Sequence, residues 1–195
     1  MKKALVFLFF LLAAVPCQAE GLQWNLDPVH TNFYFEIRHT FAAVRGQFGD
    51  FAGEVFFDPD RPEESSFAFV IQAASVDTRV GKRDTHLRSP DFFDAARYPL
   101  ITFTSTRVSA AGPDKYSVEG TLSIKDVTRK VTLAFDYHGQ RENPLKKGEV
   151  VAGLDAVLTI DRLQYHVGDG RFYKMGVVGR DVDILVTLEL LRQSP

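Results

Sequence analysis

Cysteine is almost absent from this sequence: among 195 residues the single one is Cys17, inside the N-terminal stretch 1–19. One cysteine forms no internal disulfide and builds no cysteine-based metal centre. The sequence also lacks HExxH, the glycine patterns of nucleotide-binding loops and the GxSxG elbow. These absences exclude the best-marked metal, nucleotide and hydrolase sites, and we expect no cofactor.

The histidines are few and show no metal-ligand spacing, so we expect structural or surface roles for them, no bound metal and no catalytic residue. His30 and His39 flank the first predicted strand and are expected to hold turns by hydrogen bonds. The five histidines are His30, His39, His86, His138 and His166.

No apolar run is long enough to span a bilayer. The longest, residues 4–15, has twelve residues where a spanning helix needs about twenty. It follows two lysines and precedes small residues, the pattern of a secretory signal peptide. We expect residues 1–19 to be removed by cleavage after Ala19. Lipidation of Cys17 is the weaker alternative, because Pro16 stands where a small residue is expected.

Neither sign of charge dominates, with 23 basic and 25 acidic residues. Cleavage would remove two lysines and no acid, which leaves an acidic chain and argues against nucleic acid as a partner. Residues 20–195 are enough for one domain with a substantial core. The sequence contains no internal repeat or domain-separating linker.

What the sequence has in abundance is alternation of apolar and polar residues. Phe33, Phe35 and Ile37 share one face of a predicted strand whose other face is polar, and this period of two indicates a half-buried strand. The pattern recurs around residues 46–57, 67–73, 101–106, 116–124, 131–137, 150–160 and 182–190. Seven or eight antiparallel strands predict a barrel or a sandwich.

One long segment, residues 75–99, interrupts this pattern. Ser89 followed by Pro90 and Asp91 is a helix-start signal, so we expect a helix over residues 90–97. A shorter helical turn over residues 83–87 is also expected, with Asp77 or Thr78 capping the segment that leads into it. The segment is predicted to be a folded cap that presses Leu87, Phe92 and Phe93 on an apolar surface.

The same segment carries a family resemblance. Ser75-Val76-Asp77-Thr78, Arg83-Asp84, His86-Leu87, Phe92-Phe93-Asp94, Tyr98-Pro99 and Phe103 with Ser105-Thr106 together resemble the signature of the YceI-like family, beginning upstream at Asp27-Pro28-Val29-His30. The resemblance implies a periplasmic protein with a lipocalin-like antiparallel β-barrel of about eight strands, a short helical cap between two of them, and a polyisoprenoid or similar lipid inside.

Two segments depart from the family pattern. Lys125-Asp126 replaces the usual His-Gly in a hairpin turn, where aspartate tolerates left-handed geometry. The glycine-rich loop over residues 161–179 matches the family at Asp161-Arg162 and departs from it over residues 163–166. With its aromatic side chains, this loop is the second predicted mouth segment beside the cap.

A cluster of charged residues, Asp77, Arg83, Asp84 and Arg88, lies in the cap. It admits two interpretations: an ion-pair network that fixes the cap, which we favour, or a grip on a ligand headgroup.

Inward aromatic residues either fill a core or line a cavity, and an eight-stranded barrel is at the size where both occur. The family resemblance favours a cavity. The expected lining is Phe33, Phe35, Ile37, Phe48, Phe57, Phe69, Ile71, Phe103, Leu133 and Phe135, and the expected cap and mouth residues are Arg83, Asp84, His86, Leu87, Phe92, Phe93, Tyr165 and Phe172.

The sequence thus predicts a binding protein rather than an enzyme. Its expected ligand is a polyisoprenoid, an isoprenoid quinone or a fatty-acid-type lipid, and a dimer is compatible with it. Two alternatives remain: a lipid-modifying enzyme using His30, His39 or the Asp77 and Asp84 pair, and a small outer-membrane barrel. The charged face of the first strand argues against the latter.

Overall fold

A computed structural model describes residues 22–194, and the eleven strands in this part of the chain form one antiparallel sheet. The expected signal peptide lies outside the described residues. The strands are β1 (Gln23–Leu26), β2 (Asn32–His39), β3 (Ala42–Phe48), β4 (Phe51–Phe56), β5 (Ser66–Gln72), β6 (Val76–Asp77), β7 (Leu100–Gly112), β8 (Lys115–Ile124), β9 (Val127–Glu142), β10 (Glu149–Asp161) and β11 (Val178–Gln193).

The helical elements are short. They are α1 (Gly81–Arg88), α2 (Arg171–Lys174) and three 3₁₀ turns, η1 (Pro62–Glu64), η2 (Ala73–Ser75) and η3 (Arg162–Tyr165). No helix within residues 22–194 is both long and apolar enough to cross a membrane.

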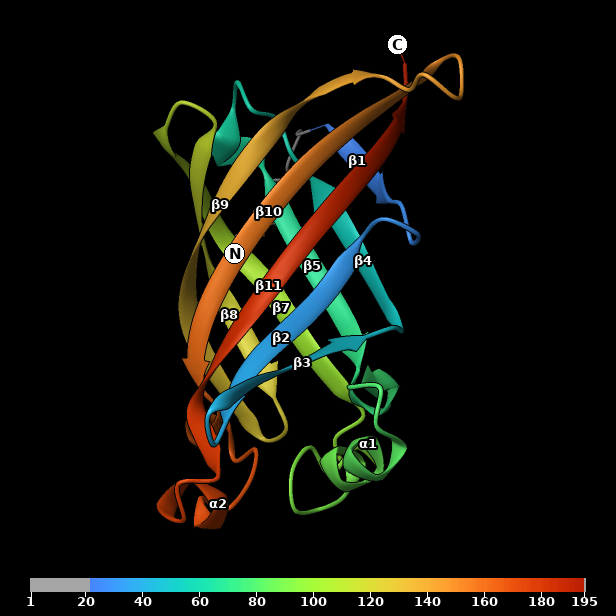
Figure 1. Ribbon diagram of the computed structural model, residues 1–195. Coiled ribbons are helices and arrows are strands. Elements are labelled where there is room, and N and C mark those ends of the chain that lie inside the picture. Colours follow the sequence, from blue (N-terminus) through green and yellow to red (C-terminus); the bar gives the residue numbers. More distant parts are fainter. Residues whose placement is uncertain (1–21, 195) are drawn as a thin grey trace, which may run out of the picture.

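The sheet closes into a barrel because β1 pairs with β4 on one side and with β11 on the other. Three of the eight positions around the barrel are each shared by two strands in succession. The first shared position, next to β11, is occupied by β1 and β2. The second is occupied by β4, which pairs with β1, and by β3, which pairs with β2. The third is occupied by β5, which pairs with β4, and by β6, which pairs with β3. The predicted eight-stranded antiparallel barrel is confirmed (Figure 1).

The two ends of the barrel differ. β1 and the C-terminal end of β11 lie at one end, and α1 and α2 lie at the other (Figure 1). At the β1 end, aromatic side chains meet across the interior. The Phe57 ring lies 5.3 Å from the rings of Tyr116 and Tyr137, and Trp24 Nε1 donates to the Phe57 carbonyl oxygen at 2.9 Å. This end of the barrel is therefore closed by packed side chains.

The position of the helix in the cap differs from the prediction. The helix is α1, around the expected shorter turn, whereas residues 89–97 form only turns. Ser89 caps one such turn, since its Oγ accepts from the Asp91 amide at 3.3 Å. The chain then folds back, because the amides of Phe93 and Ala95 donate to carbonyl oxygens at the end of α1. Asp94 takes left-handed backbone geometry at φ 49°, which excludes a continuous helix.

The β8–β9 hairpin forms with the two-residue turn that was expected, but the left-handed residue is Lys125, with φ 56°, and not the following aspartate. The turn leaves the Lys125 side chain directed at the mouth segments, where its ammonium group binds two backbone carbonyls. These contacts stabilise a conformation that is otherwise uncommon for lysine.

Candidate functional site

An apolar cavity of about 390 Å³ occupies the barrel from its middle to the α1 end. This volume is within the range of about 300–1,000 Å³ that is usual for small-molecule sites. The side chains that line it come from the inward faces of both halves of the sheet. Nine of the ten residues that we expected to line the cavity are among them: Phe33, Phe35, Ile37, Phe48, Phe69, Ile71, Phe103, Leu133 and Phe135.

Phe57 does not line the cavity, which corrects the expectation. It is fully buried in the packed β1 end, between the rings of Phe67, Tyr116, Phe135 and Tyr137. Its place in the alternating pattern is the same as that of the lining residues. Its position near the closed end of the barrel is what separates it from them.

The interior stays hollow partly because some of the phenylalanine rings lie over glycines of the neighbouring strand. Gly53 pairs with Phe69 across the strands, and a Cβ at Gly53 would lie 2.5 Å from the Phe69 ring. A Cβ at Gly120 would lie 2.7 Å from the ring of Phe103. Each ring therefore lies over a glycine, against the barrel wall, instead of pointing at the barrel axis.

The cap lines the cavity at the α1 end of the barrel, opposite the packed rings. Of the predicted cap and mouth residues, the structure places Arg83, His86, Leu87, Phe92, Phe93 and Phe172 in the lining. Asp84 and Tyr165 are absent from it. Both are buried in the packing of the mouth segments, Asp84 with 6% and Tyr165 with 2% of its surface exposed.

The charged residues of the cap do not form the ion-pair network that we expected. Asp84 accepts hydrogen bonds from the amide, at 2.9 Å, and the hydroxyl of Thr78. Arg83 donates to the hydroxyl oxygen of Thr78 at 2.7 Å and to its carbonyl oxygen at 2.8 Å. Burial alone would raise the pKa of Asp84, but the Thr78 hydrogen bonds and the nearby arginines lower it overall. The carboxylate is therefore held ionised.

The remaining two members of the cluster also bind backbone. Arg88 donates to the carbonyl oxygens of Ala74 at 2.7 Å and Val76 at 3.0 Å, and Asp77 accepts from the Arg79 amide at 2.7 Å. The cluster thus fixes the cap, as favoured, but through hydrogen bonds to backbone and to Thr78.

The cap and the 161–179 loop are joined across the mouth. Lys125 Nζ donates to the carbonyl oxygen of Phe92 in the cap at 2.8 Å and to that of His166 in the loop at 2.7 Å. Arg171 pairs with Asp91 at 2.7 Å, and the Phe92 ring stacks on a loop phenylalanine with the centroids 6.1 Å apart. The two predicted mouth segments therefore form one structure.

Sequence reasoning missed Arg162 as a cavity residue. It follows β10 directly, lines the cavity and has only 4% of its surface exposed. Its Nε donates to the carbonyl oxygen of Gly179 at 2.8 Å, and its Nη1 donates to that of Val167 at 2.6 Å. Burial lowers the pKa of this guanidinium, and the charges of Asp161 and Asp169 offset this only in part. No local signal in the sequence indicates that this arginine is buried.

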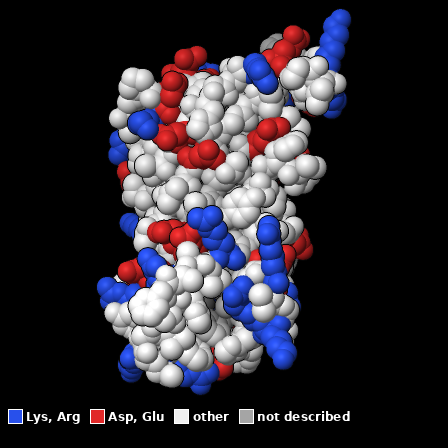
Figure 2. Space-filling view, in the orientation of Figure 1, with Lys and Arg blue, Asp and Glu red and all other residues white. Residues whose placement is uncertain are grey.

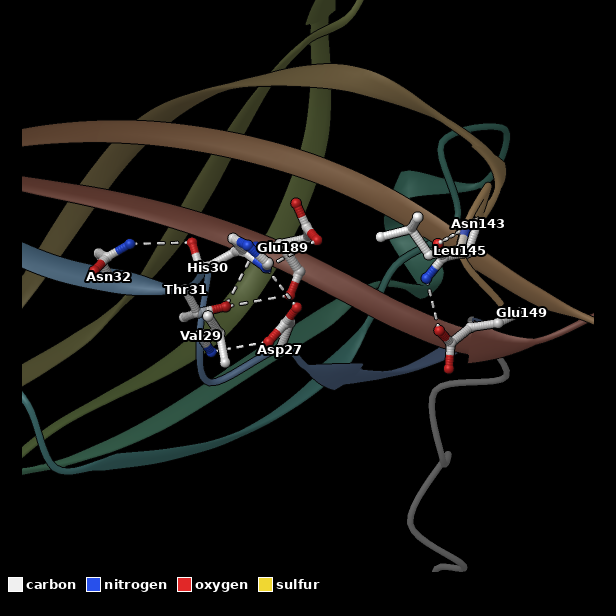
Figure 3. A network of polar contacts seen from close by, with 9 residues as sticks. All are labelled: Asp27, Val29, His30, Thr31, Asn32, Asn143, Leu145, Glu149 and Glu189. Carbon is white, nitrogen blue, oxygen red and sulfur yellow. Dashed lines mark hydrogen bonds and ion pairs between the residues drawn. The ribbon is translucent and has the colours of Figure 1, made fainter. Parts of the chain in front are cut away.

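His30 lies away from the cavity, in the turn between β1 and β2 (Figure 3). Its Nδ1 is 2.7 Å from Asp27 Oδ2 and 3.4 Å from Glu189 Oε1 on β11. The hydrogen bond that His30 donates to Asp27 raises the pKa of His30, with a further contribution from Glu189. Burial raises the pKa of Asp27, but hydrogen bonds from His30 and the Val29 amide outweigh it and lower that pKa.

The oxygen and nitrogen atoms of this trio converge as a set of cation ligands would. The distances from His30 Nδ1 are those of a hydrogen bond to Asp27 and an ion pair with Glu189. These two interactions explain why the three side chains converge. The trio connects the β1–β2 turn to β11 at the point where the pairing passes from one strand to the next. The structure therefore places His30 in the turn-holding role that its position suggested.

The closed barrel, its packed end and its apolar cavity with a helical cap define a lipocalin-like protein class. A family model for the YceI-like domain matches residues 24–190. Protein YceI of Escherichia coli O157:H7 is 32% identical over 198 residues, and the match spans all of both chains. The chain belongs to the YceI-like family.

Solved structures agree with this assignment. BcnA of Burkholderia cenocepacia superposes with a TM-score of 0.76 at 27% identity, covering 87% of this chain and all of that one. A polyisoprenoid binding domain from Saccharophagus degradans superposes with a TM-score of 0.63 over 90% of this chain and all of that one. Its identity is 15%, so this second likeness concerns the fold alone.

Proposed function

We propose that this protein binds one long-chain amphiphile with its tail in the barrel, and that it carries or stores the lipid in the periplasm. The candidate ligands are a polyisoprenoid, an isoprenoid quinone or a fatty-acid-type lipid. The observation that carries the proposal is the apolar cavity, which is closed by packed rings at one end and meets the cap at the other. The Saccharophagus domain described as polyisoprenoid-binding has the same fold.

Apolar burial supplies enough free energy for such a ligand without a binding motif. Each buried CH₂ contributes about 0.8 kcal/mol, so ten contribute about 8 kcal/mol. Association costs about 4–15 kcal/mol in lost freedom. A short tail would not offset that cost, and we therefore infer a long-chain ligand.

The periplasmic part of the proposal is supported by the signal-peptide pattern of residues 1–19 and by membership of the family. Cleavage after Ala19 would make Glu20 the first residue of the mature protein. Edman sequencing of protein recovered from an osmotic-shock fraction tests this directly. A mature chain that starts at Met1 would contradict it.

The alternatives find less support. Outward ion pairs join β2 to β3 through Glu36 and Arg45, and β8 to β9 through Lys115 and Asp136. Charged side chains are scattered over the height of the barrel on the face in Figure 2. A membrane barrel needs a continuous apolar outer band. For an enzyme, the suggested acid and base groups Asp77 and Asp84 both accept hydrogen bonds from backbone amides.

Native mass spectrometry of protein purified without detergent, followed by lipid extraction, tests the function. We expect one bound lipid, and uptake of added prenyl or fatty-acid lipids after delipidation. Ala156→Trp fills the cavity from β10 and should abolish uptake. The matched control is Val157→Trp, on the outward face of the same strand with 56% exposure, which should retain uptake. A wild-type protein that is empty and takes up none of these lipids would refute the proposal.

A further inference from the structure

The cavity contains a buried guanidinium, that of Arg162, which forms no ion pair with a carboxylate among residues 22–194. Arg162 uses Nε and Nη1 to bind two backbone carbonyls, but its Nη2 is buried and has no hydrogen-bond partner among residues 22–194. No ion pair within that part of the chain includes it. The charges of Asp161 and Asp169 act on it from a distance, and these carboxylates accept hydrogen bonds from the amides of Leu163 and Arg171.

Such an arrangement is unfavourable unless something else binds the free donor. A buried charge is normally paired and hydrogen-bonded, and a guanidinium stays protonated even when it is desolvated. Two other basic side chains of the lining differ in this respect, because each has a side-chain partner. Arg83 donates to Thr78 through two nitrogens, and His86 lies 2.9 Å from an Asp91 oxygen.

The surroundings of Arg162 place its guanidinium group near the mouth of the cavity. Its Cζ lies 5.9 Å from the centre of the Phe92 ring, and this ring contacts those of His86 and Phe172 at 5.0 and 6.1 Å between centroids. The apolar remainder of the cavity extends away from this group toward the packed end. An amphiphile with its tail in the barrel would therefore present its polar end here.

We propose that Arg162 binds an oxyanion headgroup, a carboxylate or a phosphate, so that the cavity selects an anionic amphiphile over a neutral one with the same tail. This inference rests on the proposed lipid-binding function and specifies its ligand class. The guanidinium Nη2 donates to one headgroup oxygen while the other two nitrogens remain on the protein backbone. An ionised acceptor makes this hydrogen bond about twice as strong as a neutral one.

The test compares amphiphiles that differ only in the headgroup. Delipidated protein is titrated with palmitic acid, hexadecyl phosphate and methyl palmitate, below their aggregation limits, by native mass spectrometry. We expect at least one of the two acids to bind about 10- to 100-fold more tightly than the ester. The acid that is preferred distinguishes a carboxylate from a phosphate ligand.

Variants connect the preference to this one side chain. Arg162→Met should keep the affinity for the ester and lose the preference for the acid, whereas Arg162→Lys should retain part of it. The matched control is Arg129→Met, an exposed arginine on β9 that binds the carbonyl of Gln164 in the same loop. This control should bind all three ligands as the wild type does. An unchanged preference in Arg162→Met would overturn the proposal.

A second measurement needs no variant, in case Arg162→Met fails to fold. The ¹³C chemical shift of the carboxyl carbon of labelled palmitic acid, bound to wild-type protein, is measured by NMR as the pH is varied, which gives the pKa of the carboxyl group. Beside a guanidinium its pKa falls below that of the free acid, while in a purely apolar site it rises. A raised pKa overturns the assignment for a carboxylate headgroup. Equal affinity of both acids and the ester overturns the headgroup assignment altogether and leaves lipid binding intact. Failure to bind any of the three overturns both.

Discussion

At the residue scale, the hollow interior depends on glycines that let aromatic rings lie against the wall. Phe69 occupies the space in which a side chain at Gly53 would stand. The large side chain of Phe69 and the missing side chain of Gly53 are complementary across two paired strands, and neither residue alone predicts the cavity. Glycine on a strand often marks such a close approach.

Gly53→Ala should therefore force the Phe69 ring toward the barrel axis. We expect a loss of about 1–3 kcal/mol in the free energy of unfolding, the usual result of overpacking, together with weaker lipid uptake. Chemical denaturation and native mass spectrometry measure the two effects. Gly49→Ala is the control, because a Cβ there meets no atom within 4 Å. Equal stability of the two variants would show that the ring moves freely.

The trio of Asp27, His30 and Glu189 predicts a pH-dependent contribution to stability. The folded pKa of His30 is raised, so its contribution is complete below its unfolded pKa of about 6.5 and is lost as the pH rises through the higher folded value. The folded pKa of Asp27 is lowered, so its contribution is present above about 3.9 and is lost as the pH falls.

Thermal denaturation between pH 4 and pH 8 tests this prediction. The wild type should lose stability relative to His30→Asn as the pH rises from about 6 to 8, because the variant has no proton to release. His138→Asn is a suitable control, since it removes another exposed histidine, one that pairs with Asp155. Parallel profiles for the wild type and His30→Asn would contradict the assignment.

At the scale of elements, the mouth is assembled from segments far apart in sequence. The β8–β9 turn supplies Lys125, which connects the cap to the 161–179 loop. The loop also contacts the cap directly, through the Asp91–Arg171 pair, the stacked rings and a shared apolar cluster. The turn therefore orders both mouth segments.

Lys125→Met removes both hydrogen bonds while it keeps the length of the side chain. We expect faster amide exchange in the 161–179 loop and in residues 89–98, with exchange in the β7–β10 strands unchanged. Hydrogen–deuterium exchange read by mass spectrometry measures it. Lys130→Met, an exposed position on β9, should leave both segments as in the wild type. Loop exchange at wild-type rates in Lys125→Met would show that other contacts hold the mouth.

At the scale of the whole molecule, one barrel combines a packed half with a hollow half. The packed half supplies stability through its aromatic cluster, while the hollow half lacks the contacts that side chains would make if they filled it. A ligand that fills the cavity supplies those contacts and stabilises the folded state by mass action.

Saturation with the preferred amphiphile should raise the melting temperature. At a concentration of 100 times Kd the expected gain is about 2.7 kcal/mol, which for a chain of this size is about 5–11 °C. Differential scanning calorimetry measures it, and Ala156→Trp should show no such shift. A wild-type melting temperature that is independent of the ligand would argue that the lipid binds outside the barrel.

The alternation of residues predicted most of the strands and their inward faces, because side chains on a strand alternate with a period of two, but it did not reveal the short strands β1 and β6. Phe33, Phe69 and Phe103 were placed correctly on this basis. The family resemblance in residues 75–106 favoured a barrel, which the sheet topology confirms, and the family model confirms the family itself.

Tertiary structure alone decided the rest. Phe57 follows the same alternation as Phe69, but barrel closure places one among packed rings and the other against a glycine across the sheet. Helix signals after Ser89 were overridden by hydrogen bonds back to α1. The burial of Arg162 arises from residues 167 and 179, which reach it only when the loop folds. Local periodicity encodes which way a side chain points, whereas what it meets depends on contacts between distant parts of the chain.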